Sequence, residues 1–77
     1  MREEIIEILE DIKSGVDFDS ATDIISSGIL TSLNIFSLVK ELNDEFDIEI
    51  GADKLLPENF ESVDAIEKLV IEMQDED

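Results

Sequence analysis

Three separate stretches of this sequence repeat their apolar residues at the spacing of an α-helix, and this pattern constrains the fold more than any other feature. Apolar side chains that recur every three or four residues lie on one side of a helix, so each predicted helix has one face that must be covered. The pattern therefore predicts an all-α bundle. The positions are Ile5, Ile8, Leu9, Ile12 and Val16, then Ile35, Leu38, Val39, Leu42 and Phe46, then Val63, Ile66, Leu69, Val70 and Met73.

Local signals predict where these helices begin and end. Gly15 follows Lys13 and is expected to cap the end of the first helix. The second helix is expected over residues 32–46, and Ser62 is a good N-cap for the last one. Pro57 suits the first turn of a brief helix in PENF. We expect three main helices plus one short helix, a four-helix bundle in outline, in a single domain over residues 1–77.

The segment VDFDSATDIISSGIL separates the first two predicted helices and has no sustained period. We expect a long loop, held to the core by its apolar side chains. A loop of this length in a small domain is uncommon and often functional. The side chains expected to hold it are Phe18, Ile24, Ile25 and Leu30.

Three aspartates in this loop, Asp17, Asp19 and Asp23, raise the question of a calcium site. The EF-hand spacing fails, because Ala21 stands at the third ligand position and Thr22 replaces the glycine. No metal site is therefore predicted, and an acidic metal-buffering protein is the weakest of the binding hypotheses.

The charge and the missing residue types exclude several functions. Twenty-two acidic residues face five basic ones, giving a formal charge of −17. This repels nucleic acid and anionic membranes and favours partners with basic docking patches. Without cysteine or histidine, the chain has neither disulfides nor a Ser-His or Cys-His nucleophilic pair. Carboxylates alone can still act as acid and base, but so small a chain leaves little room for an enzyme's pocket.

The apolar runs of the sequence are only a few residues long. A signal peptide or a transmembrane span needs a much longer run, so neither is expected. We expect a cytoplasmic monomer.

The second predicted helix turns one leucine away from its apolar stripe. At about 100° per residue, Leu33 lies roughly 160° from the middle of the stripe, and Phe36 lies on the flank at about 100°. Leu33 is preceded by Ser32 at the expected helix start. In one interpretation Ser32 and Thr31 simply cap the helix. In the other, Ser32 carries a covalent phosphate ester, stabilised by free N–H groups and the helix dipole.

The block SGILTSLNIFSLVKELNDEFDIEI resembles the region of acyl carrier proteins that holds the 4′-phosphopantetheine serine. In that family Asp-Ser-Leu opens helix two, and an apolar stripe, an acidic stretch, a Phe and an Ile-x-Ile follow. The later NFESVDAIEKLV is similar to the family's approach to its last helix, and FDIEI resembles D-alanyl carrier proteins. The matching residues are Ser32, Leu33, Leu38, Val39, Leu42, Phe46, Ile48 and Ile50.

The resemblance implies a carrier and not an enzyme. A phosphopantetheinyl transferase would attach 4′-phosphopantetheine from coenzyme A to Ser32. The thiol of that arm would then hold an acyl or aminoacyl group as a thioester for activating and transferring enzymes.

The resemblance also implies a partner-binding surface. Leu33 and Phe36 would make apolar contacts with those enzymes, and Ile50 would line a groove between the second and third helices. For Phe36 and Ile50, partial burial in the core is an equal alternative. Three acids would contact basic residues of the partner: Glu41, Asp44 and Glu45. The alternative for these acids is that they are simply solvated.

The sequence departs from the family pattern at three positions. Thr31 replaces the aspartate before the serine, a carboxylate thought to assist the transferase and its metal ion. Ser37 and Lys40 differ from the residues common in fatty-acid carriers, which suggests a dedicated set of partner enzymes. The alternative hypothesis is an unprimed acidic binding module of the same fold that docks a basic partner protein.

Overall fold

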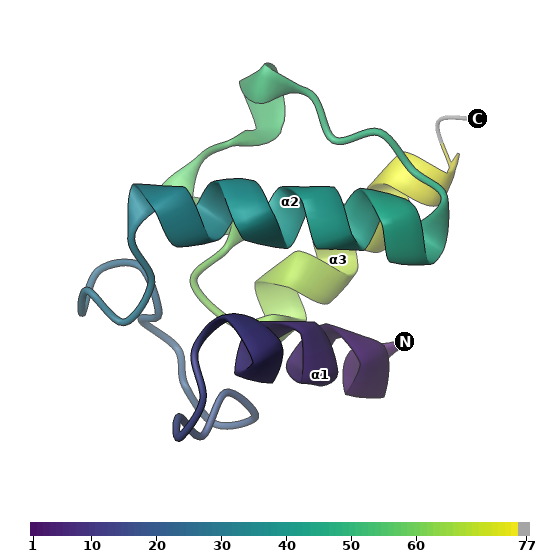
Figure 1. Cartoon of the computed structure of the whole chain (residues 1–77). Coiled ribbons are helices and arrows are strands. Elements are labelled where there is room, and N and C mark those ends of the chain that lie inside the picture. The colour runs from purple at the N-terminus through teal and green to yellow at the C-terminus, as the bar shows by residue number, and fades with distance from the viewer. Residues whose placement is uncertain (76–77) are drawn as a thin grey trace.

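The computed structural model describes residues 1–75 and is all-helical over that range (Figure 1). The predicted all-α class is confirmed, while the last two residues of the expected 1–77 domain lie outside the described residues. Between residues 1 and 75 no helix is long and apolar enough to cross a membrane. The elements are α1 (Arg2–Ile12), α2 (Ser32–Phe46), the 3-10 turns η1 (Ala52–Lys54) and η2 (Pro57–Asn59), and α3 (Val63–Asp75).

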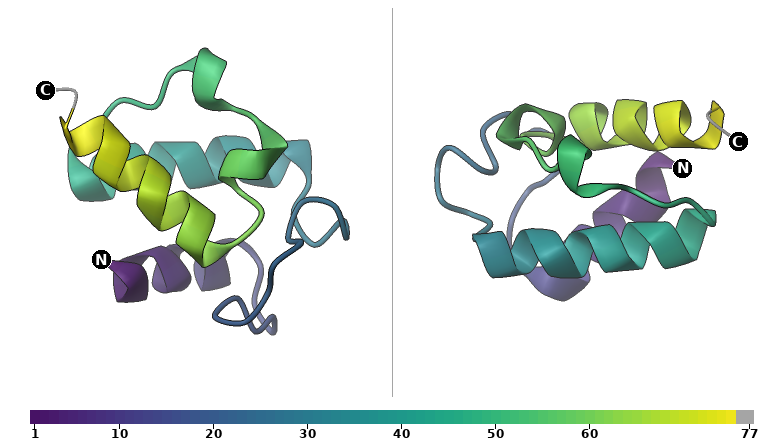
Figure 2. Two further views of the ribbon diagram at one scale, coloured as in Figure 1. Left: turned by 180° about the vertical axis from the view of Figure 1, so that it is seen from behind. Right: turned by 90° about the horizontal axis from the view of Figure 1, so that it is seen from above.

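The three α-helices surround one apolar core. α1 packs against both α2 and α3, and α3 lies at an angle to the other two helices (Figures 1 and 2). Every predicted stripe contributes buried side chains, so the helical periodicity identified the inward faces correctly. The buried residues are Ile5, Ile8, Leu9, Phe18, Ile24, Leu30, Leu38, Leu42, Ile50, Phe60, Val63, Ile66, Leu69 and Val70.

The stripe of α2 is narrower than its sequence pattern predicts. Leu38 and Leu42 are fully buried, and Val39 and Phe46 are partly buried against the core. Ile35 is only half-buried and does not pack against the buried cluster. It lies in the first turn of the helix, at the end of the stripe, so its assignment to the core face was wrong.

Of the two helix caps predicted from the sequence, the one at the start of α3 is confirmed and the one at the end of α1 is wrong. Ser62 caps α3 as predicted, because its Oγ accepts a hydrogen bond of 3.1 Å from the Ala65 N–H. Gly15 does not cap α1. That helix ends at Ile12 with the extended residue Lys13 as its cap, and Gly15 takes its positive φ of 83° in the turn beyond.

The brief helix predicted in PENF is present as the three-residue 3-10 helix η2, with Pro57 at its first position. The four-helix-bundle description was wrong, because the described chain has three α-helices. Leu56 is extended, as the residue before a proline prefers, and the Phe60 N–H closes the turn on the Pro57 carbonyl at 3.0 Å. A second 3-10 turn, η1, precedes it. The Asn59 side chain donates to the Lys54 carbonyl at 2.8 Å and joins the two turns.

The loop between α1 and α2 is held by the side chains expected to hold it. Phe18, Ile24 and Leu30 are buried, and Ile25 is half-buried against the same core. The loop therefore reaches the start of α2 along a defined path.

Candidate functional site

The start of α2 is closed by a reciprocal pair of hydrogen bonds between Thr31 and Asn34. The Asn34 N–H donates to the Thr31 Oγ1 at 3.4 Å, and the Thr31 N–H donates to the Asn34 Oδ1 at 2.9 Å. The Thr31 hydroxyl also donates to that Oδ1 at 3.0 Å. This capping box satisfies two main-chain donors that a helix end otherwise leaves free.

Ser32 is the first residue of α2 and is exposed. Among residues 1–75 its hydroxyl takes part in no hydrogen bond, because Thr31 supplies the capping oxygen. Of the two interpretations left open by the sequence, capping therefore belongs to Thr31. The Ser32 oxygen is left exposed at the positive end of the helix dipole.

The two apolar residues that follow Ser32 on the outer side of α2 face solvent. Leu33 is 77% exposed and Phe36 is 61% exposed. They are three residues apart in the helix and are therefore neighbours on its surface. Leu33 has the outward orientation expected from the helical periodicity, and Phe36 is also outside the core.

Three acids continue the exposed side of the helix towards its C-terminus. Glu41, Asp44 and Glu45 are all exposed, and within the described chain none of them is in an ion pair. We call the surface formed by Leu33, Phe36, Glu41, Asp44 and Glu45 the outer face of α2. It places an apolar pair next to Ser32 and a negative charge cluster farther along.

Ile50 is not part of this surface. It is only 7% exposed and belongs to the buried core, the alternative that the sequence left open. Asn43 fixes it there: the Asn43 Oδ1 accepts from the Ile50 N–H at 2.9 Å, and its carbonyl accepts from the Ile48 N–H at 3.2 Å. These bonds turn the DIEI segment back along α2.

The carboxylate of Glu61 binds the loop that precedes α2. Its Oε1 accepts from the Ile25 N–H at 2.9 Å and from the Ser26 N–H at 3.1 Å, and its Oε2 accepts from the Ser26 hydroxyl. The Ser26 hydroxyl, with the two N–H groups, holds the pKa of Glu61 below its ordinary value. The ionised carboxylate therefore stabilises this part of the loop.

Arg2 fastens the same loop nearer to α1. Its Nε donates to the Asp19 carboxylate at 3.0 Å and its Nη2 to the Asp19 carbonyl at 3.2 Å. Its Nη1 contacts Asp64 at the start of α3, and these partners, Asp64 first, raise the pKa of Arg2. One arginine thus joins α1, the loop and α3.

Sequence comparison relates the chain to carrier proteins of two bacteria. Over 78 aligned positions the chain is 31% identical to a D-alanyl carrier protein of Lactococcus lactis subsp. lactis, and the match covers 99% of each chain. The chain belongs to the acyl carrier protein family. It is also 33% identical over 64 residues to aminoacyl carrier protein 1 of Bradyrhizobium diazoefficiens, covering 83% of this chain and 70% of that protein. No protein-family model and no solved structure matches the chain.

Because the chain belongs to this family, its role is that of a carrier. The relatives are carrier proteins and not enzymes. Carrier proteins generally work with enzymes that activate and transfer their cargo.

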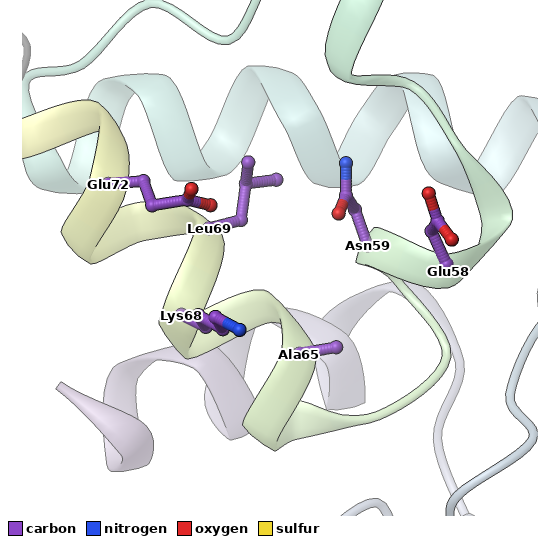
Figure 3. A pocket seen from close by; sticks show the side chains of 6 residues that line it. All are labelled: Glu58, Asn59, Ala65, Lys68, Leu69 and Glu72. Atoms are coloured by element: carbon purple, nitrogen blue, oxygen red, sulfur yellow. The ribbon is translucent and has the colours of Figure 1, made fainter.

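A pocket of about 450 Å³ lies between η2 and α3 of the carrier protein. Glu58 and Asn59 of η2 line one side, across from side chains of α3 (Figure 3). The lining is mostly polar, and none of its residues belongs to α2, so this pocket does not extend the Ser32 site. The α3 residues are Ala65, Lys68, Leu69 and Glu72.

The loop aspartates of the carrier protein have separate roles. Asp17 accepts a hydrogen bond from the Ser20 hydroxyl at 2.6 Å, whereas Asp19 pairs with Arg2. Within residues 1–75 no group of three or more carboxylates is placed to hold a metal ion.

Two residues important to this site were not identified from the sequence. Asn34 has a local signal, because it stands three residues after Thr31, the spacing of a capping box, with Asn in place of the usual Glu or Gln. Glu61 has none. It lies 36 residues from Ile25, and no pattern in the sequence joins the two.

Proposed function

We propose that this chain carries an acyl or aminoacyl group as a thioester on 4′-phosphopantetheine attached to Ser32. The observation that carries the proposal is an exposed serine at the start of α2 whose hydroxyl is left free by Thr31. Because Thr31 occupies the N-cap position, the helix end does not need the Ser32 hydroxyl. Family membership supports the same assignment.

Attachment would use coenzyme A as the donor. The Ser32 Oγ would attack the phosphorus next to the pantetheine, forming a serine phosphodiester and releasing 3′,5′-ADP, while a base of the transferase takes the hydroxyl proton. The diester's negative charge would lie beside the positive end of α2, which stabilises it. The arm would also supply the thiol, since the chain has no cysteine of its own.

The outer face of α2 would be the docking surface for the transferase and for the loading and unloading enzymes. Leu33 and Phe36 are apolar side chains that folding leaves in solvent. The net charge of −17 would speed encounter with basic patches on those enzymes, and Glu41, Asp44 and Glu45 would meet them directly. These partners would act in the cytoplasm.

We propose an aminoacyl group as the cargo. The two relatives named above are an aminoacyl and a D-alanyl carrier protein. Ser37 and Lys40 are exposed on α2, and under the family resemblance they stand where fatty-acid carriers commonly have other residues. A dedicated aminoacyl-activating enzyme would therefore load the thiol.

The test is intact-protein mass spectrometry after incubation with coenzyme A, magnesium and a broad-specificity phosphopantetheinyl transferase. Wild type should gain one phosphopantetheine and Ser32→Ala should gain none. Ser37→Ala is the matched control, since it removes another exposed serine of the same helix and should be modified like wild type. Modification of Ser32→Ala at another residue would refute the assignment.

One observation favours a second function, an unprimed binding module of the same fold. Thr31 stands where the family has an aspartate thought to assist priming. In that case the outer face of α2 would hold a basic partner protein without any arm on Ser32. Priming of Thr31→Asp, with wild type left unmodified in the same assay, would favour this second function.

A further inference from the structure

The segment before α3 and the loop before α2 lie side by side at one end of the bundle (Figure 2). Glu61 makes the connection with both its main chain and its side chain. Its carbonyl accepts from the Ile24 N–H at 2.9 Å, in addition to the three bonds that its carboxylate receives from Ile25 and Ser26. Three consecutive loop residues are therefore held by one residue.

The loop then closes on itself just before the functional serine. The Ile24 carbonyl accepts from the Leu30 N–H at 3.2 Å, and the Ile25 carbonyl accepts from the Gly28 N–H at 3.1 Å. Gly28 has a positive φ of 82°, which a glycine adopts without strain. Leu30 is buried and is followed directly by Thr31 and Ser32. A path of main-chain hydrogen bonds thus runs from the Glu61 carbonyl through Ile24 to the residue two places before Ser32. The Glu61 carboxylate reinforces this path by holding the two residues that follow Ile24.

From this geometry we propose that Glu61 is a positioning residue for Ser32: it anchors the loop that sets how the serine is presented to the phosphopantetheinyl transferase. This inference rests on the proposed function of Ser32. Glu61 itself belongs to the segment that leads into α3, and the carboxylate acts only through the loop. The negative charge strengthens the anchor, because hydrogen bonds to an ionised acceptor are stronger than neutral ones.

Loss of the anchor should weaken recognition of the carrier and leave the chemical step intact. A loosened loop would present Ser32 correctly only part of the time, and the apparent affinity of an enzyme falls in proportion to that fraction. We therefore expect Glu61→Ala to raise the transferase KM for the carrier by roughly three- to tenfold, as when Ser32 is presented correctly about a third to a tenth of the time, with kcat nearly unchanged.

Three variants separate positioning from charge and from global stability. Glu61→Ala removes the acceptor, and Glu61→Gln keeps an amide oxygen that can accept from both N–H groups. Glu58→Ala, an exposed acid three residues earlier, is the control for the lost charge. Each is assayed well below its Tm for transferase kinetics. Amide hydrogen exchange is measured by NMR at Ile25 and Ser26 and, for comparison, in the helices.

The expected result is faster exchange at Ile25 and Ser26 in Glu61→Ala, little change in the helices, and a raised KM. Glu61→Gln should recover most of both effects, and Glu58→Ala should match wild type. Three results would overturn the inference: unchanged exchange and KM in Glu61→Ala, no recovery in Glu61→Gln, or a loss confined to kcat. A wild-type chain that is never primed would refute the proposed function, while the exchange data would still test the anchor.

Discussion

Leu33 and Leu38 lie on the same helix with opposite environments, since Leu33 is 77% exposed and Leu38 is fully buried. Five residues apart at about 100° per residue, they point roughly 140° away from each other. Folding requires Leu38 and makes no use of the side chain of Leu33. Leu38 therefore belongs to the core, whereas the side chain of Leu33 is accessible on the surface.

The two leucines should respond differently to truncation. Leu38→Ala should lower the free energy of unfolding by about 2–5 kcal/mol, because it leaves a cavity in the core. Leu33→Ala should change it by less than about 0.5 kcal/mol, as is usual for exposed positions. Urea denaturation followed by circular dichroism measures both. If Leu33→Ala proved as destabilising as Leu38→Ala, the assignment of the outer face of α2 would be wrong.

Thr31 should tolerate aspartate better than alanine. Thr31→Ala removes the oxygen that accepts from the Asn34 N–H and should cost about 1 kcal/mol of stability. Thr31→Asp keeps an acceptor there and adds a negative charge at the positive end of the helix, so its cost should be smaller. Thermal unfolding of the two variants beside wild type makes the comparison. Equal losses in both would show that the cap depends on the threonine hydroxyl donating to Asn34.

Glu61 should give the stability a pH dependence of known direction. The Ser26 hydroxyl, with the two N–H groups, lowers the pKa of Glu61 in the folded state. Its contribution is therefore complete above the unfolded-state pKa and is lost as the pH falls through the folded-state pKa. The Tm difference between wild type and Glu61→Gln should be constant near neutral pH and shrink in acid.

Taking the difference between the two proteins matters because the chain has twenty-two acids. Their mutual repulsion weakens as they are protonated, which raises the stability of both proteins alike. A Tm difference that stayed constant down to about pH 3, well below the ordinary glutamate pKa, would contradict the stabilising role of the Glu61 charge.

The sequence predicted the features that depend on neighbouring residues. The bounds of α2, the cap at Ser62 and the outward side chain of Leu33 all follow from spacing within a few residues. Such patterns are local consequences of helix geometry, so they can be read without knowing the fold.

Features that depend on how the segments pack together were missed, misjudged or left open. Ile35 has the right spacing for the core, but the core does not extend to the first turn of α2. For Ile50 the sequence left a groove and the core as equal alternatives; the structure buries it, with its N–H bonded to the Asn43 side chain. Glu61 meets its loop across 35 and 36 residues of intervening chain. None of these contacts leaves a periodic signal in the sequence.

The most direct test of the account is the chemical state of Ser32 in the cells that naturally make this protein. Trypsin should release residues 14–40 as one peptide, since Lys13 and Lys40 are the flanking cleavage sites. Tandem mass spectrometry of that peptide reads the modified position among its serines and threonines. The account predicts phosphopantetheine on Ser32. A peptide found only with an unmodified Ser32 would contradict it and identify the chain as an unprimed binding module.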